Sequence, residues 1–559
     1  MSRRRPFRRC KPSGGAGGKP FWVPCLSGRR ARRPLVLAAL LLLLFTACTP
    51  AQEPAPVQTP TASEEPSQTV QPTVTPVPAA EPLALAWDPD STLAPLEANA
   101  VNRGLAPLVF EGLFALDGSF QPQNVLCSSY SQTENGLSWT FTLRDGVTFS
   151  DGTPLTGEIA ARCLNEARNS GLYRSRLSNL AAVRAGEGSV TVELSVPCAA
   201  LPALLDVPIF LAQEEGCPLG TGPYRFVEAA GELRLDAVDR WWQSQSLPAG
   251  QSLPAGQSQS LPARQILLRQ TPTADDRIAA FDTGRVTLAD TDLNASSALG
   301  YAASCETWDY PTSAMLYLGF NLRTGPCADL SVRQAAARCL DREEIAATLL
   351  AGHADAASLP LHPLSGLYDE TLAQSLAYAP QEGARLLAEG GWLPDEEGTL
   401  ARGRDKLELR LLVSSENPAR TALADQLAGE LEALGAAVTV ERLTWENFLK
   451  ALERGEFDLY VAQVKLTADF DLTALLTGEL NYGGIQDGEM NSVLSSYRAA
   501  VGTARVWLSY SLYARLTIHV PIAPVCFTRN TVLTRWGRLF GLSPVQGNLF
   551  HGLEDWVVA

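Results

Sequence analysis

The stretch WTFTLRDGVTFSDGTPLTGEIAARCLNEAR, residues 139–168, contains a strand signal and a helix signal side by side. Its first six residues alternate apolar and polar side chains, which is typical of a half-buried strand. The pairs Asp145-Gly146 and Asp151-Gly152 predict two turns around a short β segment. Thr156 then stands where an N-cap residue precedes a helix. A strand, two turns and a helix in such close succession favour an α/β fold.

Strands and helices continue to alternate along the rest of the chain, as an α/β architecture requires. Further strands are predicted for VTVELSV (190–196), LELRLLVS (407–414) and AVTVERL (437–443). Further helices are predicted for SVRQAAARCLDREEIAATLLAG (331–352) and ARTALADQLAGELEALG (419–435).

Two of the predicted helices have readable ends. In 419–435, leucines recur at helical spacing and Gly435 follows them as a C-cap glycine would. Asp341 precedes a second apolar run as an N-cap, and Gly352 ends that run. Because a capping aspartate has a structural role, we do not count Asp341 among the candidate binding residues.

The N-terminal region has the composition of an export signal. Before Cys48 there are eleven Lys and Arg and no acidic residue, and the apolar run at 35–45 is about half the roughly 20 residues of a membrane-spanning helix. This pattern predicts a signal peptide over residues 1–47. Phe45-Thr46-Ala47-Cys48 resembles a bacterial lipobox, which implies that the Cys48 thiol carries diacylglycerol. The alternatives are an ordinary secretory signal or a short uncleaved anchor.

Two segments have low complexity. Residues 48–81 are rich in Pro, Thr, Gln and Glu and have no periodic apolar face, so they cannot bury enough surface to offset their ordering entropy. We expect them to form an extended, disordered tether ahead of the folded part at 82–559. The near-tandem duplication SLPAGQSLPAGQSQSLPA, residues 246–263, is predicted to be an exposed loop expansion.

The charge balance excludes one class of partner. Of the 45 Lys and Arg, 34 remain from Cys48 onward together with all 60 acidic residues, which gives a formal charge of −26. A binder of nucleic acid usually carries a basic surface, so no nucleic-acid partner is expected. The acidity also argues against electrostatic docking on anionic lipid and leaves the covalent lipid as the predicted membrane tether.

Eight cysteines follow Cys48, but their spacing gives no disulfide pattern. No C-x-x-C occurs, although export would permit disulfides. Cys163 and Cys339 sit in alanine- and leucine-rich helical patterns, where a buried free thiol behaves as a small hydrophobic residue.

Four motifs, in this order, resemble one protein family. They are residues 139–168, GTGPYRF (220–226) followed by Trp241-Trp242, SAMLYLGFNLRTGPCADLSVRQAAARCLDREEI (313–345) and APQEGARLLAEGGW (379–392). Together they resemble extracellular solute-binding proteins, family 5, of the peptide and nickel type of ABC importer. Taken alone, GTGPYRF suggests a phosphate loop. It lacks the lysine and the spacing of the nucleotide-binding motifs, so we interpret it as scaffold.

The resemblance implies a periplasmic-binding-protein-like fold of two lobes joined by a hinge, with an extra inserted subdomain. Carried over to this chain, lobe one uses about 82–115, 215–306 and 525–559, the inserted subdomain about 116–214, and lobe two about 307–524. The chain would cross between the lobes near 308–314 and again near 521–527. Closure about such a hinge buries a ligand that contacts both lobes.

The resemblance also implies ligand contacts. In peptide-binding members an aspartate of lobe two pairs with the α-ammonium of the peptide, and the matching residue is Asp469 in TADFDLTALL. A carboxylate in a closing cleft needs a cation, which the amine of the ligand supplies. Asp471 is the alternative if the register slips, and it also suits the cap of the following helix. The aromatic residue that relatives often carry three positions before the aspartate is Leu466 here, which leaves peptide specificity open.

Four further residues match positions that line the cleft of relatives. Trp445 lies where a strand ends and a helix begins, although a lone tryptophan is usually a core residue. Tyr317 matches a tyrosine near the hinge and could equally be one more alternating strand residue. Glu97 and Asn99 lie where contacts of lobe one occur.

These features predict a lipid-anchored, extracytoplasmic solute-binding protein on the outer face of a bacterial cell membrane. Its expected partners are an oligopeptide or similar polar solute and the permease subunits of an ABC importer, and it is expected to be a monomer without a cofactor or a metal. Four histidines, without H-E-x-x-H or G-x-S-x-G, give little support to an enzyme. The alternatives are a sensor module of the same fold and a secreted hydrolase.

Overall fold

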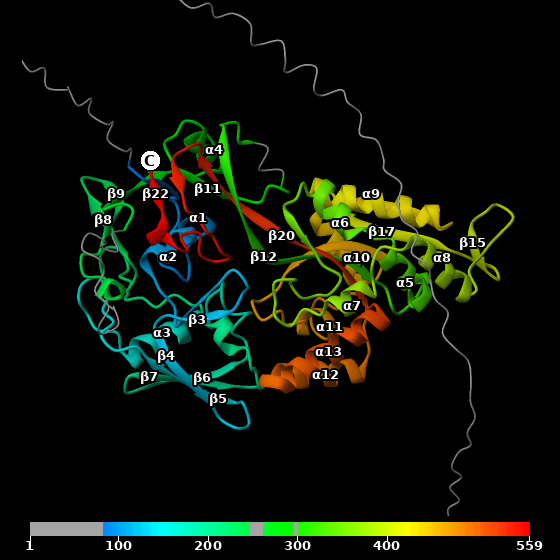
Figure 1. Ribbon diagram of the computed structural model, residues 1–559, viewed down its shortest axis with the longest axis horizontal. Coiled ribbons are helices and arrows are strands. Elements are labelled where there is room, and N and C mark those ends of the chain that lie inside the picture. Colours follow the sequence, from blue (N-terminus) through cyan, green and yellow to red (C-terminus); the bar gives the residue numbers. More distant parts are fainter. Residues whose placement is uncertain (1–81, 246–260, 296–299) are drawn as a thin grey trace, which may run out of the picture. The chain divides into compact units, whose positions relative to one another are not determined.

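The computed structural model describes residues 82–245, 261–295 and 300–559 (Figure 1). The predicted signal peptide, Cys48, the tether and most of the duplicated insert lie outside the described residues. The described chain is a mixed α/β fold, as the sequence predicts. Within it, no helix combines the length and the apolar composition needed to span a membrane.

A four-stranded sheet combines the first strand of the described chain with three strands from residues 224–270. Its order is β1 (Ala84–Trp87), β10 (Gln265–Gln270), β9 (Glu232–Ala237) and β8 (Tyr224–Ala229). β1 is parallel to β10, and the other pairs are antiparallel. The helices of this region are α1 (Ala100–Gly104), α2 (Ala106–Val109) and α4 (Ala274–Asp282).

A second four-stranded sheet contains the strand from which the sequence analysis began. Its antiparallel order is β4 (Cys127–Gln132), β5 (Ser138–Leu143), β7 (Ser189–Leu194) and β6 (Leu180–Gly186). α3 (Gly157–Ala167) packs on β6 and β7. The hairpin of β2 (Phe114–Leu116) and β3 (Pro122–Asn124) and the 3-10 turns η1 (Leu201–Leu204) and η2 (Trp242–Gln245) complete this part.

The predicted turn and cap signals around β5 and α3 are confirmed. Gly146 and Gly152 have φ of 75° and 90°, in the left-handed region that glycine adopts without steric cost. The hydroxyl of Thr156 accepts the backbone N–H of Ile159 and so caps α3.

The largest sheet has seven strands. Its order is β11 (Leu288–Thr291), β20 (Ile522–Arg535), β12 (Cys305–Phe320), β19 (Leu459–Lys465), β17 (Glu408–Ser414) and β18 (Ala437–Leu443), with β13 (Ala354–Ala356) also paired to β20. The long strands β12 and β20 run antiparallel through its centre (Figure 1).

Both faces of this sheet are buried where β12, β19 and β17 meet. Successive residues of β12 alternate between two hydrophobic clusters: Met315 and Tyr317 belong to one, and Leu316 and Leu318 to the other. Because side chains of a strand point alternately to opposite faces, the two clusters cover opposite sides of the sheet. Helices on both faces explain the nearly continuous apolar runs of these strands.

The helices around this sheet belong to the second half of the chain. They are η4 (Pro326–Ala328), α5 (Leu330–Arg338), α6 (Arg342–Glu344), η5 (Ile345–Leu349), α7 (Glu370–Gln374), α8 (Pro380–Glu389), α9 (Pro418–Ala433), α10 (Trp445–Arg454), α11 (Thr473–Leu476), α12 (Gly488–Ala499) and α13 (Gly502–His519). Two short sheets pair β14 (Leu393–Pro394), β15 (Leu400–Arg402) and β16 (Asp405–Lys406), and β21 (Leu539–Phe540) with β22 (Val557–Val558); η6 (Leu553–Asp555) precedes β22.

The predicted helix at 331–352 is interrupted. Asp341 caps α6 by accepting the backbone N–H of Glu344, as predicted. The chain then continues as the π-helix η5, in which the N–H of Leu350 donates to the carbonyl of Ile345, five residues earlier. Ile345 is buried here, as the apolar pattern predicts, so the pattern alone does not reveal this widening.

The hydrophobic cores divide the fold into two lobes. The largest core draws its buried residues from 83–310 and 532–556, and we call this part lobe one. The two cores on the faces of the large sheet draw theirs from 315–527, which we call lobe two, with the one exception of Phe120. β12 and β20 run from one lobe to the other, and their register shifts between Pro311 and Met315. This shift lies in the first segment where the sequence predicts the crossing.

Candidate functional site

The loop after β19 carries Asp469, the predicted partner of a ligand amine. The hydroxyl of Thr467 donates to Oδ1 of Asp469 at 2.5 Å. Burial raises the pKa of Asp469, while this hydrogen bond and the positive charges of Arg498 and Arg505 act in the opposite direction. A desolvated carboxylate gains from a cation that enters with a ligand.

Asp471, the alternative to Asp469, is engaged in local structure. Its Oδ1 accepts the backbone N–H and the hydroxyl of Thr473, at 3.1 and 2.6 Å, at the start of α11. Its Oδ2 lies 3.5 Å from Nε of Arg498. Asp471 therefore contacts the first residue of α11 from the position before its N-cap, Leu472, and does not make the N-cap hydrogen bond that the helix-cap interpretation predicted.

Asp469 lies close to a segment of lobe one. The backbone N–H of Ala199 donates to the carbonyl of Arg498 at 2.8 Å, which joins this segment to α12. Cys198, its neighbour, is buried; burial raises the pKa of its thiol to about 11, and the charge of Asp469 adds to this effect. The carboxylate of Asp469 thus lies where the two lobes meet.

Trp445 is the first residue of α10 and follows directly on β18 and Thr444, as predicted. Its side chain is 43% exposed, and its ring stacks on Phe448 with centroids 5.8 Å apart. Its backbone N–H donates to Glu416 Oε1 at 3.0 Å. The indole therefore offers an apolar surface at a strand end of lobe two.

The other three predicted contacts have different surroundings. Tyr317 is 3% exposed in a core of lobe two, and its hydroxyl lies 3.5 Å from that of Tyr460. Asn99 caps α1 by accepting the backbone N–H of Asn102, and its amide donates to Asp88. Glu97 is exposed one turn before α1.

The sequence analysis did not single out Lys465, the last residue of β19. Its side chain is exposed, yet desolvation lowers its pKa, and the nearby cations Arg103 and Arg176 lower it further. The carboxylates of Asp206 and Asp290 act in the opposite direction. These four neighbours all belong to lobe one, so Lys465 lies at the end of β19 that is near that lobe. A lone lysine at the end of a strand carries no signal of this in the sequence.

Arg176, one of the two cations near Lys465, is fixed by contacts within lobe one. Its guanidinium pairs with Asp206 at 2.9 Å and lies over the ring of Tyr173, 4.8 Å from the centroid. Its Nε and Nη2 have no hydrogen-bond partner among the residues that the structure describes. The guanidinium of Arg176 is therefore a partly buried cation whose hydrogen-bonding capacity is only partly used.

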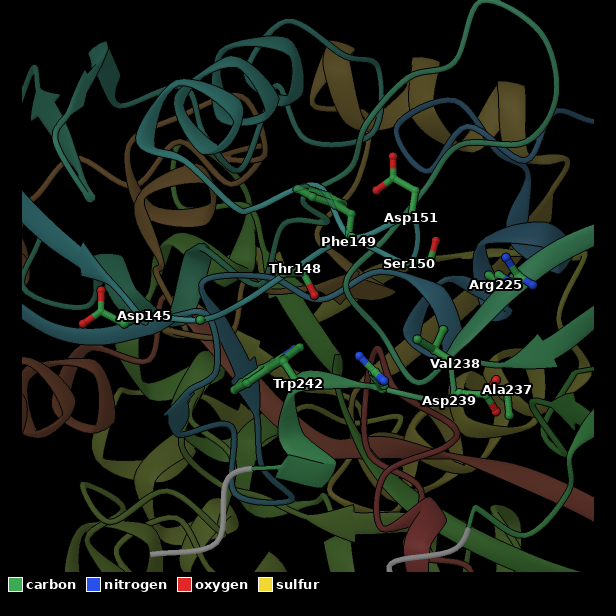
Figure 2. A pocket seen from close by; sticks show the side chains of 13 residues that line it. Asp145, Thr148, Phe149, Ser150, Asp151, Arg225, Ala237, Val238, Asp239 and Trp242 are labelled. Atoms are coloured by element: carbon green, nitrogen blue, oxygen red, sulfur yellow. The ribbon is translucent and has the colours of Figure 1, made fainter. Parts of the chain in front are cut away.

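The signature motif lines a hollow of about 720 Å³ in lobe one (Figure 2). Its lining includes Asp145, Asp151 and Asp239 together with Arg225 and Trp242. None of the predicted ligand residues lines it, which agrees with the interpretation of this motif as scaffold.

A second hollow, of about 420 Å³, lies beside Trp308 and Asp309 at the start of β12, and His551 and Ser543 also line it. No group of three or more His, Cys, Asp or Glu suited to a metal occurs within 82–245, 261–295 and 300–559. Within the same ranges all eight cysteines are free, and Cys163 and Cys339 are buried, as predicted.

Residues 121–476 match the model of the bacterial extracellular solute-binding proteins, family 5. The chain belongs to this family. The proteins of this family bind solutes. Membership therefore indicates a binding protein and not an enzyme. The predicted membership of family 5 and the predicted two-lobed α/β fold are confirmed.

Individual family 5 proteins resemble the chain at moderate identity. The glutathione-binding protein GsiB of Salmonella typhi is 26% identical over 325 residues, which are 55% of this chain and 60% of that protein. The oligopeptide-binding protein AppA of Bacillus subtilis, solved with a nonapeptide, is 19% identical with a TM-score of 0.57 over 86% of this chain and all of AppA. A nickel ABC transporter protein of Bacillus halodurans is 16% identical with a TM-score of 0.67 over 84% and 98%.

Proposed function

We propose that this family 5 protein is the lipid-anchored, extracellular solute-binding component of an ABC importer. It captures oligopeptides or a similar polar solute between its lobes by hinge closure. The match of residues 121–476 to the family model carries this proposal. A ligand that contacts both lobes binds the closed conformation more tightly than the open one. The difference between the two binding free energies sets how far the ligand shifts the equilibrium toward closure.

The two charged groups at the lobe junction favour a zwitterionic ligand. Asp469 supplies a desolvated carboxylate for a ligand amine, and Lys465 supplies a cation for a ligand carboxylate. A peptide has both groups, and glutathione, the ligand in the name of GsiB, is itself a tripeptide. Trp445 adds exposed aromatic surface. Tyr317, Glu97 and Asn99 stay predictions; Tyr317 would act through the packing of its strand.

The membrane tether in this proposal is a diacylglycerol on Cys48. Residues 48–81 would then hold the folded part away from the membrane. Cys48→Ala should move the protein from the membrane fraction to the soluble extracellular fraction, and mass spectrometry should find the lipid on Cys48 of the unchanged chain. A membrane-bound Cys48→Ala variant would contradict the lipid anchor.

The ligand is best identified with the protein as it is purified. Native mass spectrometry should detect one bound molecule of peptide mass per chain, and calorimetry with that peptide should give saturable binding to a monomer. Binding without uptake by the intact cell would favour the sensor alternative. Detection of a bound nickel complex would identify the solute as a metal chelate and not a peptide. Hydrolysis of a bound peptide would overturn the proposal in favour of a hydrolase.

A further inference from the structure

The hairpin β2–β3 of lobe one reaches into lobe two. Phe120 lies in the turn of this hairpin and is 2% exposed. The centroid of its ring lies 5.0 Å from that of His362 and 5.2 Å from that of Phe470. In the core cluster that contains Phe120, every other buried residue lies between Met315 and Phe527. Phe120 is therefore a side chain of lobe one that completes a core of lobe two.

The same hairpin contacts the loop of Asp469 a second time. Leu116, the last residue of β2, forms a small buried cluster with Ala203 and Ala468. Ala468 and Phe470 are the residues directly before and after Asp469. The hairpin thus holds both neighbours of the predicted amine-binding carboxylate.

The backbone shows that this contact is unusual. Phe120 has φ of 62° and Phe470 has φ of 54°, a left-handed conformation that bulky residues rarely adopt. Such conformations persist only where the surrounding structure fixes them. The two rings meet edge to face, at an interplanar angle of 83°, which is a favourable aromatic geometry. The contact between the two rings therefore stabilises the strained backbone of both residues.

The pocket that receives Phe120 is built next to the crossing strands. His362 is fully buried; its Nδ1 accepts the backbone N–H of Leu364 at 3.2 Å, and its ring lies 4.9 Å from that of Phe527 in β20. Its Nε2 lies 3.5 Å from Oδ2 of Asp355, in β13. Because β20 runs between the lobes, we expect a change in the angle between them to move Phe527 and so to alter the shape of this pocket.

We propose that the β2–β3 hairpin is an interlobe latch and that Phe120 is a positioning residue for Asp469. In the latched conformation Phe120 and Leu116 fix the loop 467–471 and with it the carboxylate. When the lobes separate, Phe120 leaves its pocket, its turn relaxes and the loop loses its support. This inference rests on the proposed function, since it assigns the latch to closure on a ligand that Asp469 binds.

Hydrogen exchange of the full chain, without added ligand, tests the latch. The reporters are the amides of Leu466 and Phe470, which donate to the carbonyls of Ser313 and Thr467. Phe120→Ala should raise exchange over 466–472 by about tenfold, and Phe120→Leu by less, because leucine keeps part of the apolar contact. Phe540→Ala removes a 41% exposed aromatic ring of lobe one and should leave this segment unchanged.

Exchange at the unchanged rate in both Phe120 variants would overturn the latch. Phe120→Leu keeps the result decisive if Phe120→Ala fails to fold, and the unfolding temperature of each variant reports that case. A second readout concerns positioning: Phe120→Ala should reduce the preference for a peptide with a free amino terminus over its acetylated form. If the unchanged chain binds no peptide, the proposed function fails, while the exchange result still decides whether the latch exists.

Discussion

The indole nitrogen of Trp242 donates to Oε2 of Glu111 at 2.7 Å and links two parts of lobe one that are 131 residues apart. The hydroxyl of Thr221 donates to the same oxygen at 2.7 Å, and the amide of Gln243 donates to Oε1 at 2.8 Å. The two parts of one family motif, GTGPYRF and the tryptophan pair, therefore converge on a carboxylate that the sequence analysis did not single out.

This buried carboxylate predicts a pH dependence of stability. Burial raises the pKa of Glu111 from 4.5 to about 7, although its three hydrogen bonds act in the opposite direction. Between these values the folded chain binds more protons than the unfolded chain, so this group makes stability fall as pH rises from 4.5 to about 7 and level off above. We expect a loss of roughly 1 to 3 kcal/mol across this window.

Glu111→Gln should remove that part of the pH dependence. Urea unfolding on both sides of the window measures it, and Glu232→Gln, which changes an exposed carboxylate at the start of β9, is the matched control. An unchanged slope in Glu111→Gln would contradict the assignment of the titration to this residue.

The sequence predicts local structure well where one residue determines it. Gly146 and Gly152 have the positive φ that their Asp-Gly turns required, and Thr156 and Asp341 cap their helices. Each of these depends on neighbours within a few residues. The chemistry of a turn or a cap can therefore be read without the fold.

Contacts across the lobes could not be predicted in the same way. Tyr317 alternates with its neighbours, but both faces of its sheet are buried, so alternation does not separate a core side chain from a cleft side chain. Phe120 and Lys465 meet partners that only the fold brings near them. No local pattern marks either residue.

Asp469→Ala should weaken binding of a peptide with a free amino terminus by about 30-fold or more, because breaking a buried charge pair costs about 2 kcal/mol or more. The acetylated form of the peptide has no ammonium and should lose much less. Calorimetry with the two forms measures the difference. Equal losses of affinity for the free and the acetylated peptide would contradict the pairing of Asp469 with the ligand ammonium.

Lys465→Met should act at the other end of the ligand. It removes a cation that desolvation and the nearby Arg103 and Arg176 disfavour more than Asp206 and Asp290 favour it, so the free energy of unfolding should not decrease. Affinity for a peptide with a free terminal carboxylate should fall, while affinity for its amide should not. If both forms bind as they do to the unchanged chain, Lys465 does not contact the ligand carboxylate.

Two helical glycines should respond to alanine in opposite directions. A Cβ on Gly157, in the first turn of α3, would lie 2.3 Å from the carbonyl oxygen of Gly186 and 2.4 Å from that of Ser189, so Gly157→Ala must push α3 away from its sheet. We expect the free energy of unfolding to fall by about 1 to 3 kcal/mol.

A Cβ on Gly429, within α9, meets nothing within 4 Å. Gly429→Ala should therefore stabilise the chain by about 0.5 to 1 kcal/mol, because alanine lowers the backbone entropy of the unfolded chain. Urea unfolding of the two variants under identical conditions measures both changes, and a Gly157→Ala chain as stable as the unchanged one would mean that α3 packs less closely on β6 and β7 than described.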